Sequence, residues 1–239
     1  MRTRALLAVA LTALVALSGC GAITDTNGDT GDVESIQSQA LTAGENISTY
    51  DFRMETSAGG ESESIEMNAN GTVDNDERRM YMEMAVMGQE VTQYVDGETA
   101  YQNVTGIWRT QDLSEQDLWS ERTVLQNQKE LMESSEVTLE GTTTIDGTEV
   151  YVIRVDPGDE AIRTLLSQQS TGSDQLANAD IQDVNLTQYV RTDDYHPKGS
   201  EVSLTVTDQG QTVEVAVQII LENFDRDVSI TIPEEARDG

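Results

Sequence analysis

The sequence predicts an α+β protein built on one antiparallel sheet. Apolar and polar residues alternate along many short segments, which is the period of strands with one dry and one solvated face. Asp96-Gly97 and Asp146-Gly147 each separate two such segments, and Asp-Gly is among the strongest signals for a β-hairpin. Helical patterns are confined to a segment near the N-terminus, one in the middle and one after Pro157. We therefore expect one domain over residues 33–239.

The first 19 residues have the features of an export signal. Arg2 and Arg4 precede an uninterrupted apolar run, Ala5 to Leu17, and small residues lead to Cys20. The run is too short for a membrane-spanning helix, which needs about 20 apolar residues. Cys20 is the only cysteine, so it cannot form an intrachain disulfide. Leu17-Ser18-Gly19-Cys20 is similar to the lipobox of lipoproteins, whose cysteine receives a lipid; the alternative is an ordinary signal peptide with a cysteine of no special role.

A tether and a helix are expected next. Residues 20–32 are rich in Gly, Thr, Asp and Asn without apolar periodicity, which predicts a flexible tether. Asp32 is a suitable cap for a helix that ends at Gly44, with Val33, Ile36, Ala40 and Leu41 on one face.

Strands fill most of the remaining chain. The alternation predicts strands over 50–55, 65–73, 80–86, 91–95, 100–104, 107–109, 137–145, 150–155, 184–190, 201–207, 213–221 and 228–232. Residues 114–132 are expected to form one or two helices, Pro157 suits the start of another, and 168–180 is expected to be a mobile loop.

The composition is strongly acidic, with 44 acidic and 14 basic residues and a net charge of −30. Such a chain repels nucleic-acid phosphates and anionic headgroups at low salt, which argues against a nucleic-acid partner. Molar salt shortens the Debye length to about 3 Å and screens this repulsion. Because only two lysines occur, Lys129 and Lys198, we infer a halophilic, archaeal source. Disorder is the alternative explanation of high charge, and the periodic segments argue against it.

The sequence offers little for catalysis or for a cofactor. His196 is the only histidine and lies in a charged stretch before Pro197, typical of a turn between strands. Without further histidines or cysteines, neither a Cys/His metal cluster nor a Ser-His-Asp triad can form. We expect no enzyme, no metal site and no cofactor; a hydrolase that uses carboxylates alone is the remaining alternative.

Methionines are the most informative side chains. Six of the eight lie between residues 54 and 87, several at alternate strand positions. Methionine is flexible and polarizable and adapts to irregular apolar partners. An apolar sheet face is therefore the candidate ligand-binding surface, made of Tyr50, Phe52, Met54, Met67, Met80, Met82, Met84 and Val86. The alternative is that these side chains are only core.

Four Asn-x-Ser/Thr sequons are candidate glycosylation sites, at Asn46, Asn70, Asn103 and Asn185. Chance occurrence is the alternative, because Asn and Thr are common in this chain.

Three stretches resemble the LolA/LppX-like lipoprotein carriers. They are Gln93 to Tyr101 with the following Gly106-Ile107-Trp108, Ile145 to Ile153, and Ile230 to Ala236. The resemblance implies a curved antiparallel half-barrel whose concave face is covered by helices and holds lipid or acyl chains, with no catalytic residues. We expect a lipoprotein anchored through a lipid on Cys20 to the extracellular face of the cell membrane, with a hydrophobic ligand on the concave face. The alternative is a ligand-free interaction or structural module of the envelope.

Overall fold

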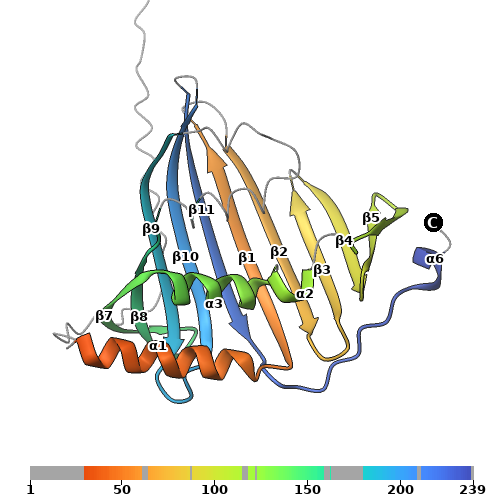
Figure 1. The fold of residues 1–239 in the computed structure, drawn as a ribbon. Helices are drawn as coiled ribbons and strands as arrows, with labels where there is room; N and C mark the ends of the chain where they lie inside the picture. Colours follow the sequence, from red (N-terminus) through yellow and green to blue (C-terminus); the bar gives the residue numbers. More distant parts are fainter. Residues whose placement is uncertain are drawn as a thin grey trace, which may run out of the picture.

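The computed structural model describes residues 30–60, 64–86, 88–114, 118–121, 123–158, 162, 180–208 and 211–237. Eleven strands form a single sheet in which every neighbouring pair is antiparallel, in the order β6-β5-β4-β3-β2-β1-β11-β10-β9-β8-β7. The strands are β1 (Thr49–Gly59), β2 (Ser64–Asp74), β3 (Arg79–Val86), β4 (Gln89–Asp96), β5 (Thr99–Val104), β6 (Ile107–Asp112), β7 (Glu136–Ile145), β8 (Thr148–Asp156), β9 (Asp180–Arg191), β10 (Pro197–Asp208) and β11 (Gln211–Glu222). The sheet is curved and open, as Figure 1 shows.

The chain builds this sheet as two meanders that meet in the middle. β1 to β6 follow one another through short turns, and β7 to β11 are neighbours in chain order on the other side. β11 then pairs with β1, with Met54 opposite Ile219. The predicted hairpin turns are present: Gly97 has φ 61°, and Asp146 and Gly147 have φ 48° and 79°, the left-handed backbone that favours Asp-Gly.

Three helices lie against the concave face of the sheet: α1 (Thr30–Glu45), α2 (Leu118–Glu121) and α3 (Val124–Ser134) (Figure 1). Thr123 caps α3, since its side chain accepts a hydrogen bond from the Gln126 amide. The Gln37 side chain of α1 donates to the Met132 carbonyl of α3. The two helices are thus joined to each other as well as to the sheet.

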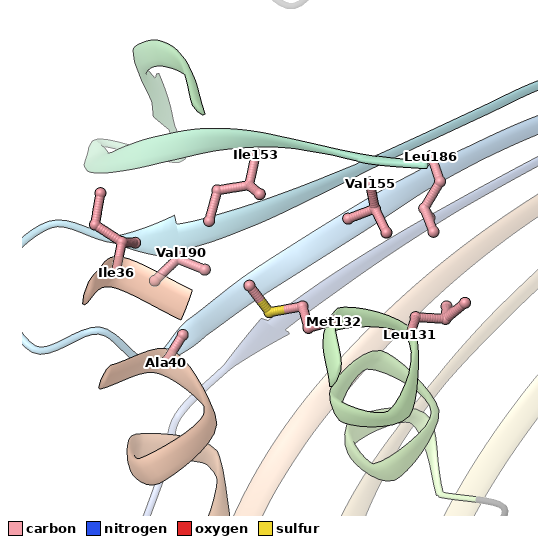
Figure 2. Packing of buried hydrophobic residues seen from close by; sticks show 8 residues of the cluster. All are labelled: Ile36, Ala40, Leu131, Met132, Ile153, Val155, Leu186 and Val190. Atoms are coloured by element: carbon pink, nitrogen blue, oxygen red, sulfur yellow. The ribbon is translucent and has the colours of Figure 1, made fainter. Parts of the chain in front are cut away.

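The largest core cluster lies between these helices and strands β8 and β9. Figure 2 shows its side chains pointing into the space between helix and sheet. The buried members are Ile36, Ala40, Leu131, Met132, Ile153, Val155, Leu186 and Val190. This confirms the expected helical face of residues 33–41 and the apolar alternation of the strands.

The predicted strand at 228–232 is wrong. After β11, which is already paired with β1 and β10, residues 223–233 leave the sheet and join neither of its edge strands, β6 and β7. Residues 223–233 instead run along the ends of the strands to α6 (Glu234–Arg237), beside β5 and β6 (Figure 1). Ile230 and Ile232 are buried, so their alternation reflects packing against the sheet without strand pairing.

Two further expectations need correction or fall outside the description. Helix α1 begins at Thr30, so Asp32 lies in its first turn and does not cap it, and the last residues assigned to the tether are helical. The helix expected after Pro157 is described only at Ile162, and the loop expected over 168–180 lies outside the described residues except for Asp180, which begins β9.

Candidate functional site

The structure brings the predicted ligand-binding residues onto one face of the sheet, the face that the helices cover. Strand register places them in successive rows, in which Tyr50 opposes Val73 and Val73 opposes Met80, while Met67 opposes Val86. We call this helix-facing side of β1–β6 and β11 the inner face. For Val86 the structure describes the backbone alone.

The eight residues differ in how far they are covered. Tyr50 and Phe52 are buried, with 0% and 4% exposure, and belong to the core. Met54, Met80, Met82 and Met84 are half-buried and pack against the cluster of Tyr50 and Phe52. Met67 is also half-buried. The methionine side chains are therefore partly open, which a purely structural core does not require.

One row across the inner face is apolar from end to end. Each member lies directly opposite the next across neighbouring strands, from β11 through β1 to β6. We call this the apolar row: Ile219, Met54, Ala69, Met84, Val91, Val104 and Ile107. Six inter-strand spacings of about 4.8 Å make it roughly 29 Å long. An acyl chain of one bilayer leaflet spans about 15 Å, half of the hydrocarbon core.

The apolar row is only partly covered by protein. Ala69 is buried, Ile219, Met54, Met84, Val91 and Val104 are half-buried, and Ile107 is 61% exposed at the end of the row. Alternation and methionine content did not single out Ile219, Val91, Val104 or Ile107 as part of this surface. The turn after Val104 could have indicated part of this surface, because a two-residue turn places Val104 opposite Ile107.

The end of the inner face nearest the helices is closed by aromatic and aliphatic side chains. Val95, Ala100 and Leu113 form a buried cluster against which Met80, Leu118 and Trp119 pack. The Trp119 Nε1 donates a 2.7 Å hydrogen bond to the Gly97 carbonyl, which ties α2 to the β4–β5 turn. Met80 packs against these buried side chains and is therefore better described as a core residue than as a ligand contact.

Phe52 takes its place because Gly71 has no side chain. The two residues are directly opposite, and a Cβ on Gly71 would lie 2.7 Å from the Phe52 ring and 2.3 Å from the Tyr81 carbonyl oxygen. The ring thus lies over the glycine and fills the row between Leu221 and Met82. This packing shapes the floor beside the apolar row.

Buried polar contacts hold α3 over strands β9 and β10. The Gln188 Nε2 donates to the Gln128 carbonyl at 2.9 Å, and the Gln128 Nε2 donates to the Ser200 Oγ at 3.1 Å. All three residues are at most 5% exposed. Because buried polar groups without partners are costly, these bonds specify where the helix sits. No motif in the sequence pointed to them.

A cavity of about 860 Å³ opens at the lower edge, between the end of α1, the α2–α3 segment and the turns of the first meander. Leu125 and Trp119 form apolar parts of its wall, while Glu45, Arg78 and Lys129 line it with charge. The Lys129 Nζ lies 2.6 Å from a Glu45 carboxylate oxygen, and this contact raises the pKa of the lysine. Since polar groups predominate in the lining, the cavity suits water and polar groups better than an acyl chain.

His196 and Tyr50 are two titratable residues whose surroundings the structure describes. His196 lies in the β9–β10 turn as expected, with its Nδ1 2.8 Å from Asp194 and its ring stacked on Phe224 at 5.1 Å. Burial raises the pKa of Tyr50 well above its ordinary value, so this phenol stays neutral. In the described part of the chain, no group of three His, Cys, Asp or Glu side chains is arranged to hold a metal ion.

Of the four sequon asparagines, Asn46, Asn70 and Asn185 are exposed and Asn103 is half-buried. The Asn103 Oδ1 accepts a 2.8 Å hydrogen bond from the Gly106 amide in the β5–β6 turn. Residues 1–29, which include Cys20, lie outside the described part of the chain. None of the described helices is long and apolar enough to cross a membrane.

Comparisons with known proteins identify a matching family and solved structures with a similar fold. The model of a family of unknown function, DUF6612, matches residues 33–239. The crystal structure of the lipoprotein LppX from Mycobacterium tuberculosis is similar, with a TM-score of 0.57 and 15% identity, over 83% of this chain and 99% of LppX. This likeness confirms the LolA/LppX-like fold.

Two other solved structures are more distant. LprF from Mycobacterium bovis matches with a TM-score of 0.49 and 13% identity, over 86% of this chain and 98% of LprF. A LolA superfamily protein from Nitrosomonas europaea matches with a TM-score of 0.31 and 10% identity, over 82% of this chain and 94% of that protein. A search of curated proteins by sequence gives no significant match.

Proposed function

We propose that this chain, which belongs to the family of unknown function DUF6612, is an envelope lipoprotein that binds a lipid or acyl chain on its inner face. The observation that carries the proposal is the apolar row, which runs across seven strands and is only partly covered by helices. A contiguous, half-open apolar surface in a chain with 44 acidic residues favours contact with an apolar ligand.

The energetics favour a long chain as the ligand. Burial of each methylene yields about 0.8 kcal/mol, so a chain of about 15 methylenes yields roughly 12 kcal/mol. Association costs at least about 4 kcal/mol, so the dissociation constant is no tighter than about 1 μM. A chain half as long would be left with about 2 kcal/mol, too little for useful binding. The length of the apolar row accommodates the longer chain.

Two neighbouring residues of β3 provide the test. Met84 lies on the inner face in the apolar row, whereas Ala85 is exposed and faces the other way. Met84→Glu places a carboxylate against the ligand, while Ala85→Glu adds the same charge outside. The intact chain is purified in an amphipathic polymer at high salt, and its lipid is extracted and quantified by mass spectrometry. We expect Met84→Glu to retain less than a tenth of the lipid and Ala85→Glu to match wild type.

A wild-type protein that carries no lipid and binds no fatty acid would refute this function. Circular dichroism of both variants shows whether the sheet is intact. If Met84→Glu folded and still retained its lipid, the ligand would not lie along the apolar row.

We propose further that residues 1–19 are a signal peptide, that residues 20–32 connect a lipid on Cys20 to the domain over 33–239, and that the protein faces the outside of the cell membrane. The charged start, apolar run and small residues before Cys20 support this. The acidic composition supports a halophilic source. We also propose that the exposed sequon asparagines, Asn46, Asn70 and Asn185, carry glycans.

A second candidate, a ligand-free interaction module of the envelope, is favoured by the opposite face of the sheet. There the ring centroids of Tyr81 and Tyr94 lie 5.0 Å apart, and that of Trp108 lies 6.1 Å from that of Tyr94. All three side chains are half-buried. Aromatic residues are enriched at protein interfaces. Photo-crosslinking from position 108 in intact cells tests this: a specific protein adduct supports the module, and adducts to lipid alone contradict it.

A further inference from the structure

The inner face is almost free of charge. Across β1–β6 and β11, the acidic residues all fall at the alternate positions that point away from the helices. These are Asp51, Glu55, Glu66, Asp74, Glu83, Glu90, Asp96, Asp112, Glu214 and Glu222. Among the described residues of these strands, the inner face has one charged side chain, Arg109 on β6.

Arg109 stands beside the end of the apolar row. It lies two residues from Ile107 on the same face of the edge strand, about 6.7 Å along the strand. Across the sheet Arg109 opposes Gln102, and Gln102 opposes Gln93. A polar row of one guanidinium and two amides therefore runs alongside Val91, Val104 and Ile107.

Arg109 is also available for a ligand. It is exposed, and within the described residues it forms no ion pair, unlike Arg53, Arg79, Arg191 and Arg226, each of which contacts a carboxylate within 4.0 Å. Gln93 and Gln102 are half-buried beside it. Guanidinium groups bind phosphate and carboxylate in bidentate geometry, and amide groups add hydrogen bonds to the same oxygens.

We propose that Arg109, Gln102 and Gln93 bind the anionic headgroup of the lipid whose chain lies along the apolar row. The inference rests on the proposed function and narrows the ligand to an acyl lipid with a phosphate or carboxylate at its head. Molar salt screens the repulsion from the net charge of −30, so direct contact with the exposed Arg109 guanidinium favours such a lipid over a neutral one. The competing explanation is that Arg109 protects the edge strand β6 from pairing with other chains.

The test separates headgroup from tail. Decyl phosphate, decanol and inorganic phosphate are titrated by calorimetry into the intact chain, in an amphipathic polymer and 1 M salt. At this ionic strength the Debye length is about 3 Å, so only direct contacts contribute. We expect wild type to bind decyl phosphate about tenfold more tightly than decanol, the effect of one charge-assisted contact. Arg109→Gln should abolish that preference without weakening decanol binding, and Arg109→Lys should keep most of it.

Arg154 on β8 is the matched control. It is exposed, has no ion pair among the described residues and lies on the face opposite the core of Ile153 and Val155. Arg154→Gln removes the same charge and should leave both affinities unchanged. Equal binding of decyl phosphate and decanol by wild type, or a loss of preference in Arg154→Gln, would overturn the headgroup site.

The outcomes also separate the headgroup site from lipid binding itself. Binding of both decyl ligands with equal affinity removes the headgroup site and leaves lipid binding intact. Wild type that carries no co-purified lipid and binds neither ligand removes both, because ten carbons alone yield only about 4 kcal/mol by the same balance. Inorganic phosphate that binds as tightly as decyl phosphate would show an ion site that does not use the acyl chain, and would contradict the proposal. Arg109→Gln protein that still prefers decyl phosphate to decanol would also contradict it, even if the variant aggregates.

Discussion

Replacement of Gly71 by alanine tests how the inner face is packed. The new Cβ would lie 2.3 Å from the Tyr81 carbonyl oxygen and 2.7 Å from the Phe52 ring, and real Cβ atoms do not approach so closely. Overpacking of this kind costs about 1–3 kcal/mol, and displacement of Phe52 loses part of a further ~2 kcal/mol of burial. Alanine recovers about 0.4–1 kcal/mol by restricting the unfolded chain. The net loss is then about 2–3 kcal/mol.

For a domain of this size such a loss lowers the midpoint of thermal unfolding by roughly 4–12 °C. Thermal unfolding of the intact chain at fixed high salt, followed by circular dichroism, measures the shift. Gly158→Ala is the control, because apart from its chain neighbours no atom of the described residues lies within 4 Å of the position that its Cβ would take, and it should change stability by less than about 0.5 kcal/mol. In a Gly71→Ala background, Phe52→Leu should cost less than it does alone. Gly71→Ala protein as stable as wild type would refute the reasoning.

Three other predictions concern anchoring, salt and pH. Cys20→Ser should move the protein from the membrane fraction to the soluble fraction on cell fractionation, and continued membrane association would contradict the lipid anchor. Transfer from molar to millimolar salt should unfold the domain by charge repulsion, and retention of the strand signal in circular dichroism would count against this. Burial alone would raise the pKa of Asp51, but hydrogen bonds from Thr72, Arg226 and Asn223 outweigh it and lower the pKa below its ordinary value. Asp51→Asn should therefore lower the free energy of unfolding by on the order of 1 kcal/mol at neutral pH, and this difference from wild type should vanish as the pH falls through the lowered pKa. Urea unfolding of both proteins at neutral pH and at a pH below the lowered pKa measures the difference.

The strands were predictable because their signals are local. Alternation over 50–55 and 80–86 reports a half-buried strand whatever its partner, and Asp-Gly turns report the hairpins. The segment 228–232 shows where this fails. It has the same alternation, but the segment runs along the ends of the strands, and its isoleucines are buried without strand pairing. Sheet order is a non-local property, and the pairing of β11 with β1 has no signature in either segment.

The candidate site was predictable in kind and only partly in its residues. The methionines lie on the face that the helices cover; on this face Tyr50 and Phe52 belong to the core, while Val91, Val104 and Ile107 extend the apolar surface to the sheet edge. Valine and isoleucine in strands are too common to stand out in a sequence. The sequence does not single out Arg109, because one arginine in an acidic chain is not distinctive. Only the strand register shows that Arg109 is the one charged side chain on the described strands of the inner face.

Register also explains why the turns matter for binding. Since side chains alternate and β3 is held in register by β2, a slip of one residue between β3 and β4 would turn Val91 away and bring Glu90 to the inner face. The same slip would cut the apolar row and set a carboxylate against the ligand. The β3–β4 connection is short and includes Gly88 at φ 78°, a conformation that residues with a side chain rarely adopt. Gly88→Val should therefore weaken lipid binding through register as well as stability, whereas a substitution that only destabilised the fold would lower the unfolding midpoint and leave the affinity of the folded protein unchanged.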